Sequence, residues 1–328
     1  MPPVRKRSRQ PVRSPRTASP AADKVPQAQL LFRTRTAHHD IYVRQRGSVR
    51  YLSFEPGVQA PCQAKIDLNT PATLEGDFEY AQALASAVAL HPEPTRVLCL
   101  GVGGGAVPQA LRCVFPGATV DAVDIDKTVL DVAHEWFGLR DDDRLRLHAC
   151  DARSFLRRAG AQGLRWDVVL HDAFDRHYTP AHLMTVEFYR ELSAVLGEGG
   201  FVAVNAFAQG ELRDRETATF GEVFADYFQI GVVASRIVVA FPSPRPSAEV
   251  MWATLLRHDS ALARAGLDVQ DLALRMRSAD ALAADVRPLI DDDRDCPELA
   301  RLRREATGRA LTSAHAGPSV SPPGWKPR

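Results

Sequence analysis

Short apolar runs that alternate with helix-like segments constrain the fold of this chain more than any other feature. Such alternation is typical of buried parallel strands joined by helical crossovers. Two more strand-like stretches, 228–233 and 236–241, are close enough in sequence to form an antiparallel pair at one edge. We therefore predict an α/β fold with a doubly wound, mostly parallel seven-stranded sheet. Its first five strands are expected over residues 96–100, 119–125, 145–149, 167–171 and 201–205.

Composition along the chain divides it into four regions. Residues 28–76 hold short alternating stretches separated by turn residues, which predict a small N-terminal β-hairpin domain. Residues 77–311 carry the strand and helix alternation and predict the sheet domain. Residues 1–27 hold seven Lys or Arg and one acid, with few large apolar side chains, so we expect a disordered basic tail. Residues 312–328 are rich in proline and are expected to form a second disordered tail.

Several classes of protein are excluded by the same sequence. No apolar run approaches the roughly 20 residues that span a bilayer, so no membrane partner is expected. The five cysteines are odd in number and lack Cys-x-x-Cys spacing, which indicates neither a disulfide framework nor a zinc site. The histidines show no ligand pattern either, and we expect no metal. A cytoplasmic protein fits these features.

Small and acidic residues follow the first two predicted strands. Ligands of an open α/β sheet bind beyond the carboxyl ends of its strands. Gly101, Gly103 and Gly105 follow the first strand, where they permit a tight turn and a close approach of backbone N–H groups to a ligand. Asp124 and Asp126 close the second strand, where a carboxylate accepts hydrogen bonds from ribose hydroxyls. These features alone also fit a nicotinamide dinucleotide site.

The next two strands distinguish between these cofactors. Asp151 and Ala152 follow the third strand, at the place where adenosylmethionine enzymes put an acid for the adenine amino group. Asp172 and Asp175 follow the fourth strand and present two carboxylates at the mouth of the sheet. Taken alone, Asp126 or Asp151 fits a helix N-cap equally well. Four successive strands that end in such groups favour a nucleoside-binding site.

The order of these motifs resembles the spermidine synthase family of aminopropyltransferases over about residues 40–242. Further matches are Val58-Gln59, Asp77-Phe78-Glu79-Tyr80 and Glu187-Phe188-Tyr189. The resemblance implies a class I methyltransferase-like Rossmann fold and a role in polyamine biosynthesis. The group donor would be decarboxylated S-adenosylmethionine, or S-adenosylmethionine itself, and the acceptor a polyamine or related amine. The implied nucleoside ligands are Gln59, Asp124, Asp151 and Ala152, the implied amine ligand is Tyr80, and the implied catalytic residue is Asp172.

The chemistry of sulfonium donors supports the same roles. An alkyl ammonium, with a pKa of about 10, has no lone pair, so a carboxylate must hold it and accept its proton as attack on the donor carbon begins. Asp172 is the candidate base. Asp175 and Asp77 are candidates for holding a distal cationic group of the acceptor.

Departures from the family keep other functions open. The family has an aspartate where this chain has Gly104, and a neutral loop discriminates less between the two donors. Phe174 and Arg176 are also departures, in the loop that would gate the acceptor. The first alternative is an S-adenosylmethionine-dependent methyltransferase, the second a non-catalytic nucleoside-binding protein, and the most distant a nicotinamide oxidoreductase. The expected partner is a small-molecule amine. The resemblance allows a homodimer, and no nucleic acid partner is expected apart from weak contact by the basic tail.

Overall fold

The computed structural model describes residues 28–57, 60–74, 79–175, 178–279, 281–293 and 297–305. The two predicted tails, and the candidate residues Gln59 and Asp77, lie outside the described residues. None of the helices in the described part of the chain has the length and apolar character that crossing a bilayer requires.

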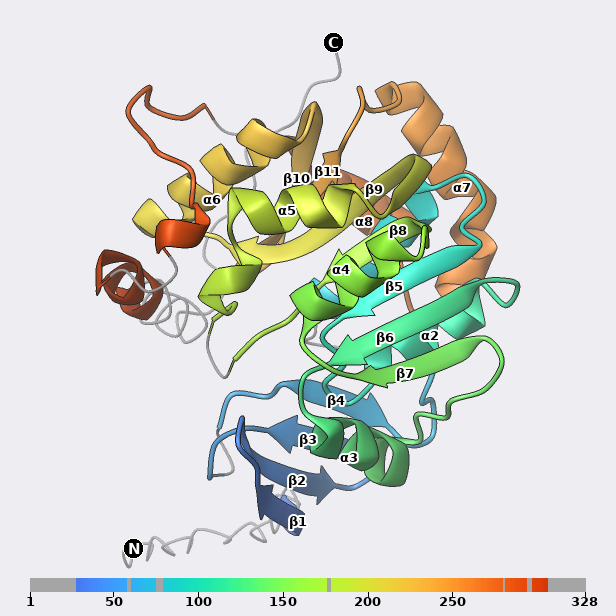
Figure 1. The fold of residues 1–328 in the computed structure, drawn as a ribbon. Coiled ribbons are helices and arrows are strands. Elements are labelled where there is room, and N and C mark those ends of the chain that lie inside the picture. The colour runs from blue at the N-terminus through green and yellow to red at the C-terminus, as the bar shows by residue number, and fades with distance from the viewer. Residues whose placement is uncertain are drawn as a thin grey trace, which may run out of the picture.

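The large sheet has parallel strands from its centre to one edge and antiparallel strands at the other edge (Figure 1). The strand order is β12-β10-β11-β9-β8-β5-β6-β7, with β7, β6, β5, β8 and β9 parallel. This confirms the doubly wound α/β fold. The sheet has eight strands and not seven, because a short strand after the last predicted pair joins β10. The strands are β5 Arg96–Leu100, β6 Thr119–Asp124, β7 Leu145–Ala149, β8 Trp166–His171, β9 Leu196–Phe207, β10 Asp226–Gly231, β11 Ser235–Phe241 and β12 Met276–Ser278.

Helices cover both faces of this sheet, and each face has its own apolar core. On one face lie α1 Glu79–Ala87, the 3-10 turn η1 Val88–Leu90, α2 Ala106–Val114, α7 Ala248–Arg264 and α8 Val269–Arg275. On the other lie α4 Ala152–Ala161, α5 Val186–Ser193 and α6 Gly210–Val223. The helix α5 begins at Val186, where the hydroxyl of Thr185 caps it by accepting from the N–H of Phe188 (3.3 Å).

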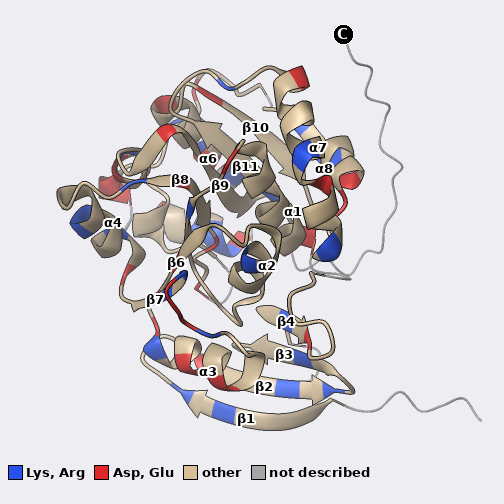
Figure 2. Cartoon of the chain, turned by 90° about the vertical axis from the view of Figure 1, so that its right-hand side faces the viewer, with Lys and Arg blue, Asp and Glu red and all other residues tan. Residues whose placement is uncertain are grey.

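A small antiparallel sheet precedes the large one, with the order β1-β2-β3-β4. The predicted hairpin is thus part of a four-stranded sheet. Its apolar face packs against α3 Lys127–Phe137 through Val129, Val132 and Phe137, and Figure 2 shows α3 lying across it. This contact fixes the small sheet beside the carboxyl ends of β5 and β6. Its strands are β1 Gln29–Arg35, β2 Asp40–Arg46, β3 Val49–Ser53 and β4 Ala64–Asp67.

The C-terminal part packs against α5 and α6 in a mostly extended form. Residues 281–290 are not helical, the 3-10 turn η3 Asp291–Asp293 follows, and a helical segment spans 297–305. The path of this segment is fixed by Leu289, whose side chain is fully buried. Its N–H donates to Thr219 Oγ1 (2.9 Å) and its carbonyl accepts from the N–H of Val186 (2.8 Å). The extended segment is therefore held against α5 and α6.

Candidate functional site

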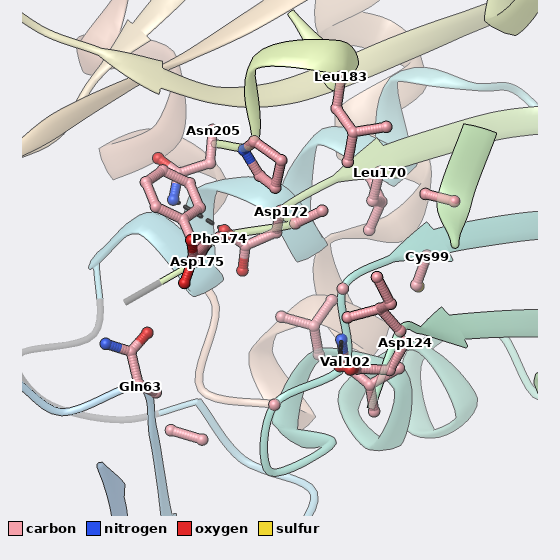
Figure 3. Close-up of a pocket in the computed structure, with 18 of the residues that line it drawn as sticks. Gln63, Cys99, Val102, Asp124, Leu170, Asp172, Phe174, Asp175, Leu183 and Asn205 are labelled. Carbon is pink, nitrogen blue, oxygen red and sulfur yellow. Dashed lines mark hydrogen bonds between the residues drawn. The ribbon is translucent and has the colours of Figure 1, made fainter. Parts of the chain in front are cut away.

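A cavity of about 530 Å³ lies at the carboxyl ends of β5, β6 and β8, where the sequence predicts the site. Residues from the small sheet, the helix α1 and the loop after β8 complete its walls. In Figure 3, Asp172 lies between Asp124 and Val102 on one side and Phe174, Asp175 and Asn205 on the other. The cavity therefore has two ends that meet at Asp172.

The glycine loop joins two strand ends at the floor of this cavity. Gly101 has a φ of +92°, and a Cβ there would lie 2.3 Å from the carbonyl oxygen of Asp172. Glycine thus lets the end of β5 touch the end of β8. Gly103, with a φ of +53°, also lines the cavity. Gly105 does not line it, and instead forms the left-handed N-cap of α2.

Gly104 is held between the two sheets and does not line the cavity. A Cβ at this position would lie 2.7 Å from Cβ of Ala64 and 3.0 Å from the ring of Phe137. The glycine is needed because β4 and the end of α3 approach the loop closely here. A side chain at 104, such as the aspartate that the resemblance leads one to expect, would require Ala64 or Phe137 to shift.

Asp124 is the acid that joins the glycine loop to the nucleoside end of the cavity. Its Oδ2 accepts from the N–H of Val102 (3.1 Å) and its Oδ1 from the N–H of Asp126 (3.0 Å). Burial raises the pKa of Asp124, which these N–H donors oppose. Each carboxylate oxygen can accept a further bond, so Asp124 can accept from ribose hydroxyls.

Asp126 is placed differently from its prediction as a nucleoside ligand. Its Oδ1 caps α3 by accepting from the N–H of Thr128 (2.9 Å), and its Oδ2 accepts from Thr36 Oγ1 (2.5 Å). The residue is buried and does not line the cavity. The capping alternative therefore describes Asp126, which links α3 to the turn between β1 and β2.

Substitutions of Asp124 and Asp126 distinguish a nucleoside ligand from a helix cap. We expect Asp124→Ala to weaken binding of methylthioadenosine by about 1.5–3 kcal/mol, because buried ribose hydroxyls lose a charged acceptor. Asp126→Ala should instead lower the free energy of unfolding by about 1 kcal/mol through the lost cap, with little change in affinity. Isothermal titration calorimetry and urea unfolding of both variants measure these effects. Equal affinity losses in the two variants would show that the assignment of Asp124 is wrong.

Asp151 lines the cavity and caps a helix at the same time. Its Oδ1 accepts from the N–H of Ser154 at the start of α4, and its Oδ2 lies 2.7 Å from Nε2 of His182. These contacts, above all the one with His182, hold the pKa of Asp151 well below its usual range. Ala152 lines the cavity beside it. Asp151 is thus an anion fixed at the end of β7, beside the strand β6 that ends in Asp124.

Asp172 lies where the two ends of the cavity meet. Burial raises its pKa to about 7. Asn205 Nδ2 donates to Asp172 Oδ1 (2.8 Å), while Asn205 Oδ1 is buried without a hydrogen-bond partner. Tyr80 also lines the cavity, and its hydroxyl donates to the carbonyl of Gln63 (3.2 Å). Asn205 Oδ1, beside the carboxyl of Asp172, can therefore accept a hydrogen bond from an N–H group of a ligand.

Two residues of this site, Asn205 and His182, were not predicted from the sequence. Asn205 is a polar residue near the end of the buried strand β9, so the rule that ligands bind at strand ends could have found it. His182 lies in the 3-10 turn η2 Ala181–Leu183, far from Asp151 in sequence, and no local signal indicates their contact.

The cavity is strongly acidic. Asp175 is exposed and also lines it, so four carboxylates face the same space, those of Asp124, Asp151, Asp172 and Asp175. Among the described residues of its walls there is neither lysine nor arginine. Such a cavity favours cationic ligands.

This chain is similar in sequence to two kinds of transferase. A spermine/spermidine synthase domain matches residues 77–242. A polyamine aminopropyltransferase from Vibrio vulnificus is 28% identical over 250 residues, which cover 75% of this chain and 83% of that protein. An eEF1A lysine and N-terminal methyltransferase from Mus musculus is 30% identical over 141 residues, which cover 39% of this chain and only 20% of the mouse protein.

Solved structures share the fold. A probable spermidine synthase from Corynebacterium glutamicum superposes with a TM-score of 0.62 at 20% identity, covering 81% of this chain and 97% of that one. Human methyltransferase-like protein 13, solved in complex with SAH, gives a TM-score of 0.52 at 24% identity and covers 56% of this chain and 92% of its own. Both kinds of transferase thus use this α/β architecture.

Proposed function

Since this chain belongs to the spermine/spermidine synthase family, we propose that it is a transferase that moves an aminopropyl group from decarboxylated S-adenosylmethionine to a small-molecule amine. The acidic cavity carries this proposal. Decarboxylated S-adenosylmethionine holds two positive charges, a sulfonium and an ammonium, and no carboxylate. Intact S-adenosylmethionine adds a carboxylate, which would have no lysine or arginine partner among the described residues that line the cavity.

The transfer is an in-line displacement in which the cavity aligns the two substrates. The nucleoside lies at the end formed by Asp124, Asp151 and the glycine loop, with the amine at Asp172. The amine nitrogen forms a bond to the aminopropyl carbon beside sulfur, and the carbon–sulfur bond breaks. Its electron pair stays on sulfur, so neutral methylthioadenosine leaves. The proton of the attacking ammonium passes to Asp172.

Asp172 and Asn205 have different roles toward the acceptor amine. A carboxyl whose pKa is about 7 is close to half ionised at neutral pH, and it is a stronger base toward the bound ammonium than an ordinary aspartate. The free Asn205 Oδ1 can accept a second N–H of the same amine. Two acceptors direct the nitrogen lone pair toward the donor carbon.

Methyl transfer is the second candidate. It is favoured by the glycine loop 101–105, which holds no carboxylate that could repel the carboxylate of intact S-adenosylmethionine, and by the similarity to methyltransferases. The same Asp172 would deprotonate an amine for either donor.

The by-product identifies the reaction. We expect the purified protein, incubated with an amine and decarboxylated S-adenosylmethionine, to release methylthioadenosine, and to release little S-adenosylhomocysteine when given the intact donor. Liquid chromatography with mass spectrometry measures both, with Asp172→Asn as the control for background hydrolysis. Release of S-adenosylhomocysteine alone would establish methyl transfer. Donor binding without any by-product would indicate a nucleoside-binding protein that is not an enzyme.

A further inference from the structure

The C-terminal helical segment 297–305 covers the loop that follows Asp172, although it lies outside the matched family domain. Leu299 and Leu302 are buried in an apolar cluster with Phe207, and Phe174 and Tyr178 pack against this cluster. The segment therefore packs behind Phe174 and Phe207, which line this end of the cavity, while none of the described residues 297–305 lines the cavity itself.

This segment brings a cation to the loop. The guanidinium of Arg303 lies 4.0 Å from the centre of the Tyr178 ring. Tyr178 is joined to Asp175 by two backbone hydrogen bonds, from the N–H of Asp175 to the carbonyl of Tyr178 (2.8 Å) and from the N–H of Tyr178 to the carbonyl of Asp175 (3.1 Å). Burial lowers the pKa of Arg303, and the charges of Tyr178 and Asp175 oppose this effect. Arg303 thus contributes positive potential where Asp175 would hold a second ammonium.

Beyond Asp172 the wall of the cavity is aromatic and apolar. Phe174 and Phe207 both line it, with ring centres 6.2 Å apart. Ala206 and Pro180 line it as well. In Figure 3 the ring of Phe174 lies on the side of Asp172 away from Asp124. Such a wall stabilises a hydrocarbon chain by burying its surface.

We propose that the acceptor is a primary amine with an uncharged, apolar tail, and that Arg303 disfavours acceptors with a second ammonium at the distal end. This inference rests on the proposed function. One ammonium binds Asp172 and Asn205, and the tail packs on Phe174 and Phe207. A diamine would bring its second charge toward Asp175, where it would also meet the positive charge of Arg303 beside Tyr178. Asp175 then closes the loop through its contacts with Tyr178 and does not act as the distal cation site predicted from the sequence.

Two amines of equal length test this proposal. With decarboxylated S-adenosylmethionine as donor, hexylamine should have a kcat/KM at least about fivefold above that of 1,6-diaminohexane, as expected for one screened like-charge contact. Arg303→Gln should raise kcat/KM for the diamine about fivefold, mainly through KM, and leave hexylamine within about twofold. Arg303→Lys keeps the charge and should keep the discrimination. Arg304→Gln, at the exposed neighbouring position, is the matched control and should change neither value.

Binding separates this inference from the proposed transfer reaction. Isothermal titration calorimetry of both amines, with methylthioadenosine bound, reports the preference even if neither amine is turned over. A wild-type preference for the diamine, or a ratio that Arg303→Gln leaves unchanged in a folded protein, would overturn the role of Arg303. Absence of turnover together with the expected binding ratio would count against the reaction and support the acceptor class.

Discussion

Asp172→Asn is expected to lower kcat by about two to four orders of magnitude, the usual contribution of a positioned general base. Asparagine keeps the shape and can still accept from Asn205 Nδ2, but it cannot take a proton from the bound ammonium. The affinity for methylthioadenosine should change little, because the nucleoside lies at the other end of the cavity. Steady-state kinetics and calorimetry on the same preparation measure the two effects.

The raised pKa of Asp172 also predicts how activity and stability depend on pH. Its folded-state pKa of about 7 lies above the ordinary value of an aspartate, so the native protein holds the proton over the range in which the unfolded chain has lost it. kcat/KM for the amine should rise with pH through about 7 as the base ionises, and this limb should vanish in Asp172→Asn. The free energy of unfolding should fall over the same range, from about pH 4 to 7, and the variant should lack that fall.

Asp175→Asn is the matched control, since its carboxylate lines the same cavity but is exposed. It should change kcat by less than about tenfold, because it lacks a positioned contact with the reacting amine. Losses of similar size in the two variants, or a pH limb that survives in Asp172→Asn, would assign the base to another group.

Arg153→Met is expected to lower the free energy of unfolding by about 2–4 kcal/mol, near the lower part of the range for a broken buried ion pair. The Arg153 side chain is only 5% exposed. It donates to both oxygens of Asp291 (2.6 and 2.9 Å), to Glu191 (2.7 Å) and to the carbonyl of His182 (3.3 Å). The guanidinium of Arg153 thus links α4 to α5, η2 and η3. The partial exposure of Glu191 and Asp291 reduces the penalty.

Arg157→Met is the comparison for this variant. Arg157 also pairs with Glu191 (2.9 Å), but its side chain is 60% exposed, so its loss should cost less than about 1 kcal/mol. Urea unfolding of both variants at pH 7 measures the difference. Equal changes would show that burial of Arg153 does not strengthen its contacts. Because removal of Arg153 frees the carbonyl of His182, whose ring contacts Asp151 at the nucleoside end of the cavity, the KM for the donor should also rise in Arg153→Met.

Local patterns were sufficient to locate the candidate site but not to assign each acid. The ends of β5, β6, β7 and β8 meet at one edge because parallel strands share their direction, which strand order and hydrophobic period already specify. Asp126 and Asp151 have the same pattern of an acid before a helix. Only packing distinguishes them, since Asp126 turns toward Thr36 while Asp151 faces the cavity and His182.

The alternating apolar runs therefore specified the α/β class, the glycine loop and the position of Asp124 and Asp172, because hydrophobic period and chain direction are properties of short segments. Tertiary structure decided the rest. The raised pKa of Asp172 depends on burial, the exclusion of a Cβ at Gly104 depends on Ala64 and Phe137, and the place of Arg303 depends on the fold of the C-terminal segment. These properties arise from contacts between residues far apart in sequence, and no local period encodes such contacts.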